Sequence, residues 1–148
     1  MNKPGIEAWA GILKVHAAVV PQLDLLLQRE HNLPLTWYDV LLELNAAPGR
    51  QLTMTELGQR AVVSRTRVSR VVDELTRQGL VVRETNPEDG RSAYAVLTPE
   101  GRARLRVAAP TYLEGIRRFF SQYLSQHGAA CMAQTLGRVL DRLEHEAR

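Results

Sequence analysis

The side chains in this sequence that could do chemistry are arginines, and they gather on one short segment. Between Glu56 and Asp73 the chain has no acidic residue but four cations: Arg60, Arg65, Arg67 and Arg70. A guanidinium group stays charged at physiological pH and presents a planar fork of donors that fits phosphate oxygens or the edge of guanine. The segment therefore points to binding of a polyanion, with nucleic acid as the candidate.

The chain offers little support for catalysis. It has no glycine-rich phosphate loop and no nucleophile elbow, and its four histidines show no metal-ligand spacing with the single cysteine, Cys131. Asp73 and Glu74 are neighbours on a predicted helix, so their carboxylates do not face each other as an acid/base pair would. We expect no enzyme activity, no metal and no cofactor.

The lone cysteine and the apolar runs suggest a cytoplasmic protein. Cys131 has no partner for a disulfide, and no signal-like segment opens the sequence. The run at 17–20 is broken by Pro21, Gln22 and Asp24, well short of the ~20 apolar residues that a bilayer span needs. We therefore expect a cytoplasmic location and no membrane span.

Cys131 also raises the possibility of redox sensing. Its neighbours Ala129, Ala130 and Met132 are small or apolar, and no cation lies nearby in sequence to lower the pKa of the thiol. These neighbours favour a buried, unreactive cysteine over a sensing thiol.

Two short helices are predicted to hold the arginines. Thr53-Met54-Thr55-Glu56 has the capping-box pattern and opens a helix of about two turns, and Ser64 is the predicted cap of the next helix. On that second helix one apolar stripe follows the spacing i, i+3, i+4, i+7 until Gly79 ends it: Val68, Val71, Val72 and Leu75. Arg65, Arg67 and Arg70 then project from the faces that the stripe leaves free.

A β-hairpin is predicted directly after these helices. Residues 80–85 and 93–97 are rich in β-branched and aromatic side chains, and the polar segment 86–92 joins them. Thr98 and Pro99 have the types that begin a helix. Upstream, Thr36 with Asp39 is the predicted start of another helix.

The outer helices are too apolar to be covered by one short chain. Residues 6–31 carry apolar side chains on almost every face, with a kink expected at Pro21, and Gly128 is expected to separate the last helix, about 129–147. That last helix should point five residues inward: Met132, Leu136, Val139, Leu140 and Leu143. A second subunit is the simplest cover for the first helix.

The predicted fold is mainly α with a small β-hairpin wing (α+β), namely a winged helix-turn-helix lobe at 33–106 with dimerisation helices at 1–32 and 107–148. In such a fold the second helix of the motif enters the DNA major groove, and the hairpin reaches the backbone or the adjacent minor groove.

Three segments resemble the MarR-type winged-helix transcriptional regulators. Residues 35–41 (LTWYDVL) are similar to that family's second-helix opening, and 57–75 are similar to its helix-turn-helix. Most specific is Asp89-Gly90-Arg91-Ser92 followed by Leu97-Thr98-Pro99-Glu100-Gly101, which resembles the wing signature.

The resemblance implies a set of DNA contacts on the second helix of the motif and on the wing. These are Ser64, Arg65, Thr66, Arg67, Ser69, Arg70 and Arg91. An arginine at a hairpin tip suits the strongly negative minor groove, which agrees with a contact by Arg91. Asp89 would repel phosphate, so it is expected to orient Arg91 or to hold the loop. The arginines of the helix cannot all read bases, so some must contact the backbone.

The resemblance also implies a homodimer, a pseudo-palindromic double-stranded DNA operator and control by a small molecule. In this interpretation the protein is a repressor that a small aromatic, phenolic or other anionic effector releases, with His16, Trp37 and Tyr112 as candidate pocket residues. Two alternatives remain open at this stage: a redox-sensing regulator that uses Cys131, or a protein-interaction winged helix without DNA activity.

Overall fold

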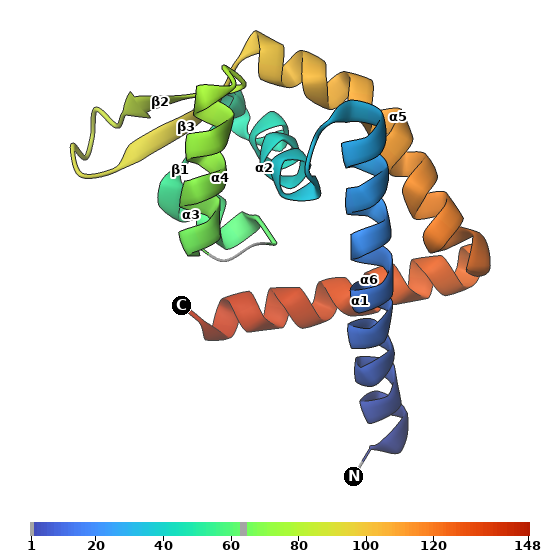
Figure 1. Ribbon diagram of the computed structural model, residues 1–148. Helices are drawn as coiled ribbons and strands as arrows, with labels where there is room; N and C mark the ends of the chain where they lie inside the picture. The colour runs from blue at the N-terminus through green and yellow to red at the C-terminus, as the bar shows by residue number, and fades with distance from the viewer. Residues whose placement is uncertain (1, 63–64) are drawn as a thin grey trace.

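The computed structural model describes residues 2–62 and 65–148 and forms a winged lobe flanked by long helices (Figure 1). In chain order the elements are α1 (Lys3–His31), α2 (Leu35–Ala46), η1 (Pro48–Arg50), β1 (Gln51–Thr53), α3 (Met54–Arg60), α4 (Arg65–Arg77), β2 (Val81–Thr85), β3 (Ala93–Leu97), α5 (Pro99–Phe119), η2 (Ser121–Tyr123) and α6 (Gln126–Glu146). The predicted mainly α fold with a hairpin wing is confirmed.

The wing hairpin belongs to a three-stranded antiparallel sheet in the order β1-β3-β2. β2 and β3 pair as predicted, with Val82 opposite Val96, and β1 adds to the other edge with Leu52 opposite Ala95. Our sequence analysis missed β1, because three residues are too few to show the alternation that marks a strand.

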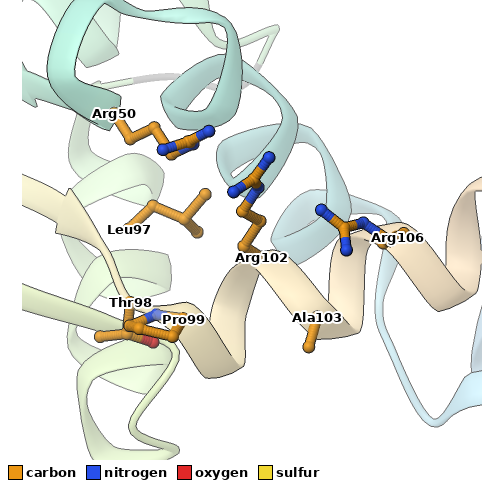
Figure 2. Close-up of a pocket in the computed structure, with 7 residues that line it drawn as sticks. All are labelled: Arg50, Leu97, Thr98, Pro99, Arg102, Ala103 and Arg106. Atoms are coloured by element: carbon orange, nitrogen blue, oxygen red, sulfur yellow. The ribbon is translucent and has the colours of Figure 1, made fainter.

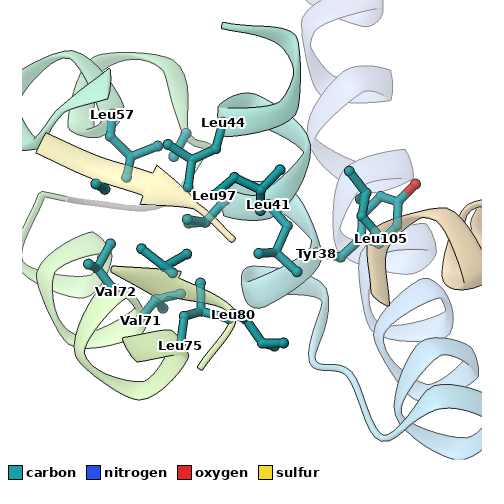
Figure 3. Close-up of a cluster of buried hydrophobic side chains, with 14 of the residues drawn as sticks. Tyr38, Leu41, Leu44, Leu57, Val71, Val72, Leu75, Leu80, Leu97 and Leu105 are labelled. Carbon is teal, nitrogen blue, oxygen red and sulfur yellow. The ribbon is translucent and has the colours of Figure 1, made fainter. Parts of the chain in front are cut away.

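The core of the lobe lies between α2, α3, α4 and the sheet, and α5 closes it at one side (Figure 3). The predicted stripe of α4 is buried in full, with Val72 and Leu75 at 0% exposure. Leu41 and Leu44 of α2 and Leu57 of α3 meet it in the same cluster. Burial of this stripe fixes which face of α4 remains outside.

Local signals set the ends of α3, α4 and α5. In the predicted capping box, Glu56 N donates to Thr53 Oγ1 at 3.1 Å and Thr53 N donates to Glu56 Oε2 at 2.9 Å. Gly79 adopts φ 73°, and Leu80 N donates to the carbonyl of Leu75 at 3.0 Å, which is the glycine-closed ending predicted for α4. Thr98 caps α5.

The predicted cap at Thr36 is wrong. α2 begins one residue earlier, at Leu35, and its N-terminus is satisfied from another helix: Leu35 N donates to Asp24 Oδ1 of α1 at 2.9 Å. A carboxylate eleven residues upstream replaces the local hydroxyl, so the first helix and the lobe are joined by a hydrogen bond.

α1 is one continuous helix that includes Pro21, and the kink expected there stays a prediction. α5 approaches α1 closely at Gly115, where a Cβ would lie 2.7 Å from Leu23 Cδ2. Ser125 caps α6, so Gly128 lies in the first turn of α6 and does not separate the two helices.

α6 buries no residue in the single chain, and the prediction that five of its apolar side chains point inward is wrong for one subunit. Met132, Leu136, Val139, Leu140 and Leu143 are 38–61% exposed. In the view of Figure 1, α6 runs from the end of α5 back across α1, and its C-terminal end lies below the winged lobe. A helix with an exposed apolar face of this kind needs a protein surface to bury it, and the single chain does not supply one.

The burial predicted for Cys131 is also wrong for the single chain. The thiol is exposed, and Sγ lies 3.5 Å from His127 Nε2, one helical turn earlier. The sequence argument considered only adjacent residues and so missed this i, i+4 neighbour.

α1 is long and apolar enough, by length and composition, to cross a membrane, although its apolar runs are interrupted. An interface helix of a soluble protein satisfies the same criterion. The C-terminal end of α1 packs into the lobe, where Leu27 is fully buried.

Candidate nucleic-acid interface

The outer face of α4 carries the residues predicted to contact DNA. Thr66, Arg67, Ser69 and Arg70 are exposed, opposite the buried valines and Leu75. Arg65 is the first residue of α4, but its side chain and all of Ser64 lie outside the described part of the chain. The described part of the outer face therefore presents two hydroxyls and two guanidinium groups on one helix.

The two acidic side chains of α4 are both engaged. Asp73 Oδ1 accepts from Arg83 Nη2 of β2 at 2.8 Å, and the same Arg83 nitrogen lies 3.5 Å from the carbonyl of Ser69. Glu74 Oε2 accepts from the indole Nε1 of Trp37 in α2 at 2.7 Å. Both carboxylates lie in the second half of α4, so its first half keeps an excess of positive charge.

The chain that leads into α4 is held by a carboxylate from α2. Asp39 Oδ2 accepts from the backbone N–H of Val62 at 3.0 Å. Burial raises the pKa of Asp39 above its usual value, and this hydrogen bond opposes the rise. Asp39 was predicted as part of the cap of its own helix, but its carboxylate holds Val62, just beyond the end of α3.

Side chains close the loop at the tip of the wing. Asn86 is buried and donates through Nδ2 to Ser92 Oγ at 2.9 Å, across the base of the loop. Asp89 Oδ1 accepts from the backbone N–H of Arg91 at 3.0 Å, and the Asp89 carbonyl accepts from Ser92 N at 3.1 Å. The Arg91 side chain is exposed at this tip.

The contact between Asp89 and Arg91 is made through the backbone. The Asp89 carboxylate accepts from the backbone N–H of Arg91, and no ion pair joins the two side chains in the described part of the chain. The role of Asp89 in orienting Arg91 or in holding the loop stays a prediction.

A sequence model of the MarR family matches residues 31–92, from the end of α1 to the end of the wing loop. Over the whole chain, the fold matches the crystal structure of Sco3205, a MarR family transcriptional regulator from Streptomyces coelicolor, in complex with DNA. The TM-score is 0.81 at 29% identity, and the match covers 100% of this chain and 91% of that one. In sequence and in fold, the chain resembles MarR family transcriptional regulators.

Other MarR-family and helix-turn-helix proteins agree with this assignment. AbsC of S. coelicolor, a MarR family transcriptional regulator, matches with a TM-score of 0.83 and 26% identity, covering 98% of this chain and 97% of that one. The transcriptional repressor YetL of Bacillus subtilis is 31% identical over 106 residues, which are 72% of this chain and 63% of YetL. YkoM of B. subtilis, an uncharacterized transcriptional regulator, is 38% identical over 63% of this chain and 59% of its own length.

The match thus spans less than two thirds of YetL and YkoM. Both are described as helix-turn-helix regulators and neither as an enzyme. One long apolar helix in the described part of the chain, α1, does not by itself indicate a membrane protein.

The three candidate effector residues lie in different settings. Trp37 is half-buried and bonded to Glu74, and the Tyr112 ring packs on that of Tyr38 with 4.4 Å between centroids. His16 is exposed on α1. The effector role of these residues stays a prediction.

Two cavities stand out in the described part of the chain, and none of the three candidates lines either of them. One, of about 340 Å³, lies between α1 and α5 and is lined by Leu26, Glu30, Pro110, Thr111, Glu114, Gly115 and Arg118. The other, of about 280 Å³, lies between η1 and α5 and is lined by Arg50, Leu97, Thr98, Pro99, Arg102, Ala103 and Arg106.

Sequence reasoning missed the residues that support the interface from behind. Arg83, Glu74 and Asp39 each act on an element far away in the chain. For Arg83 one signal was present, since a lone cation on a predicted strand next to an acid-bearing helix is a candidate ion pair. Nothing local marks the other two.

Proposed function

We propose that this protein is a sequence-specific, dimeric DNA-binding transcriptional regulator and not an enzyme. One observation carries the proposal: α4 exposes arginines and hydroxyls on the face opposite its buried stripe, beside a wing with an exposed arginine at its tip. The full-length likeness to a family member crystallised with DNA supports it.

In this proposal α4 lies in the major groove and the wing reaches the adjacent minor groove. An α-helix of 13 residues is about 20 Å long, so its first two turns can lie between the phosphate walls while its C-terminal end stays outside. Arg67 and Arg70, together with Arg65, supply base or phosphate contacts, and Thr66 and Ser69 supply hydroxyl contacts. Arg91 enters the minor groove, where the potential is most negative.

A homodimer follows from the uncovered helices. α1 exposes Ile6, Trp9 and Leu13, and α6 exposes Leu140 and Leu143, each at least half exposed in the single chain. A second copy that packs these helices against their equivalents hides the apolar surface and relates the two copies of α4 by a dyad. The operator is then pseudo-palindromic, with half-sites roughly 10 bp apart.

We infer repression with release by a small aromatic or phenolic anion, in the cytoplasm. An effector acts only through unequal affinity for the DNA-competent and DNA-incompetent arrangements, and a tenfold effect needs about 1.4 kcal/mol of difference. Trp37 of α2 is bonded to Glu74 of α4, the helix proposed to enter the major groove, and Tyr112 of α5 packs on Tyr38 of α2. A ligand that moves either ring therefore changes the contacts that hold α2 against α4 or α5.

The deciding experiment is selection of bound DNA from a random double-stranded pool at two salt concentrations. The wild-type protein should enrich one pseudo-palindromic sequence, and salicylate should weaken its binding to that sequence. No enrichment together with millimolar affinity would contradict DNA regulation and favour a protein-interaction domain. Enrichment without any response to salicylate or related phenolic anions would contradict only the effector.

A further inference from the structure

Three arginines from two distant segments meet at the cavity between η1 and the first turns of α5. Arg50 comes from the turn before β1, and Arg102 and Arg106 lie one turn apart on α5 (Figure 2). The figure shows the guanidinium of Arg102 between those of the other two. The buried side chain of Leu97 and the ring of Pro99 complete the wall, so the cavity is apolar below and cationic at its rim.

No acidic side chain lines this cavity. Within the described residues, none of the three guanidinium groups forms an ion pair, and Arg50 Nε makes only a long hydrogen bond, to Asn45 Oδ1 at 3.4 Å. The positive charge of Arg50 is the largest cause that lowers the pKa of Arg102, followed by partial loss of solvent and then by the charge of Arg106. Like charges gathered without a counter-ion repel one another, and a bound anion removes that repulsion.

The backbone that presents Arg50 is unusual. Gly49 has φ 65° and Arg50 has φ 52°, so two successive residues lie in the left-handed region. A glycine adopts this conformation freely, whereas an arginine pays steric strain for it. Strain of this kind is typical of residues whose side chains are held in place for binding.

The cavity lies away from the proposed DNA-binding face. Leu97 is at the opposite end of β3 from the wing loop, and Thr98 binds Gly79, just beyond the C-terminal end of α4, through a 2.8 Å hydrogen bond to its carbonyl. DNA contacts are expected at the other ends of both elements, at the start of α4 and at the wing tip. These arginines are therefore not explained by the proposed groove contacts.

We propose that this cavity binds a small multivalent anion, either a phosphorylated compound or a di- or tricarboxylate. The anion bridges Arg50 on one side and Arg102 with Arg106 on the other, and its apolar part rests on Leu97 and Pro99. Guanidinium forks bind phosphate and carboxylate oxygens in the same bidentate way, so one site serves both classes. The bound anion ties η1 of the lobe to α5, and this inference does not depend on DNA binding.

The test is calorimetric titration of the full chain with inorganic pyrophosphate and with succinate, each against sodium chloride at matched ionic strength. At least one of the two should bind with one site per chain. Changing Arg50, Arg102 and Arg106 together to Gln should weaken that binding at least tenfold. Arg138→Gln removes one positive charge from the exposed surface of α6 and should leave the binding unchanged, so it is the control for each single Arg→Gln change at the cavity.

Arg50→Gly separates a binding defect from a folding defect. Glycine accepts the positive φ, so this variant should unfold at the same or a higher temperature without anion, while its anion affinity falls at least threefold. Binding of neither probe, equal binding by the triple variant, or an effect that sodium chloride reproduces would overturn the proposal. The probe that binds more tightly identifies the phosphate or the carboxylate class.

Discussion

The indole nitrogen of Trp37 donates a 2.7 Å hydrogen bond to Glu74 Oε2 and so joins α2 to the back of the proposed recognition helix. Trp37 is half-buried against the core, and Glu74 sits next to Asp73, which is itself paired with Arg83. Two adjacent carboxylates of α4 thus attach this helix to α2 on one side and to the wing on the other.

Trp37→Phe should lower the free energy of unfolding by about 1–2 kcal/mol, because a phenyl ring keeps part of the packing but lacks the indole nitrogen that donates to a charged group. Denaturant unfolding of this variant, of Glu74→Gln and of the double variant measures the coupling. If the bond matters, the second change should cost much less on top of the first than alone. Strict additivity would show that the contact contributes nothing.

Changing Arg65, Arg67 and Arg70 together to Ala should abolish specific DNA binding while the protein stays folded, because the described side chains of this set lie on the exposed face. Single Arg→Ala substitutions distinguish the arginines that contact bases from those that contact phosphates. Loss of a base contact should cost roughly 1–3 kcal/mol at one operator position, and loss of a phosphate contact should flatten the salt slope by about one unit. Arg138→Ala on α6 is the control, and unchanged affinity in the triple variant would refute the docking.

Arg91→Ala should remove most specific binding with little effect on folding, because an exposed side chain at the wing tip buries little apolar surface. Titration of the selected operator measures this loss. Circular dichroism melting should give the same midpoint for variant and wild type, and a large drop would show instead that Arg91 supports the fold.

Asp89→Ala should weaken DNA binding, whereas Asp89→Asn should keep most of it. The bond to the Arg91 backbone N–H needs only an oxygen acceptor, which asparagine retains and alanine lacks. A purely long-range electrostatic account predicts that both variants bind more tightly at low salt, since each removes a negative charge near phosphate. Titrations at two salt concentrations distinguish the two accounts.

Gly101→Ala should destabilise the protein by about 2–3 kcal/mol, because a Cβ there would lie 2.1 Å from the carbonyl oxygen of Leu80 and 2.8 Å from Leu97 Cδ1. The first of these atoms is backbone and cannot turn aside. Gly137→Ala on α6 meets nothing within 4 Å and should be neutral or gain up to about 1 kcal/mol. Equal thermal midpoints for the two variants would contradict the close approach of α5 to the end of α4.

Leu136→Glu should dissociate the proposed dimer, since it places a charge in the apolar side of α6. Leu42→Glu on α2 is a matched control, because both leucines are 38% exposed in the single chain. Sedimentation at micromolar concentration should give twice 16.6 kDa for the wild type and the control, and 16.6 kDa for Leu136→Glu. A wild type that sediments as a single chain would rule out the dimer.

The sequence alone determined the elements whose signals are local. The stripe from Val68 to Leu75, the capping box at Thr53 and the glycine ending at Gly79 each depend on residues within one or two turns, and all appear in the structure as predicted. The hairpin and the cap at Thr98 belong to the same class. Together they place the cationic face of α4 beside the wing.

The tertiary structure decided what depends on partners far apart in the chain. β1 exists because β3 offers it an edge, and Leu35 is capped by Asp24 of another helix and not by Thr36. Asp39 holds Val62 because α2 and the end of α3 pack together. A carboxylate finds whichever unsatisfied N–H the fold brings to it, and sequence distance gives no measure of that approach.

At the surface too, the sequence determines the residue types and the tertiary structure decides their neighbours, as the apolar residues of α6 and the arginine cluster at Arg50 show. The heptad-like spacing of Leu136 and Leu140 revealed an apolar side but not that it faces outward from its own chain. Nothing in the sequence distinguishes Arg102 and Arg106 from the other arginines. The left-handed turn at Gly49 and Arg50 places Arg50 beside them at the cavity. Side-chain types follow from the sequence, whereas their neighbours follow from how the backbone closes on itself.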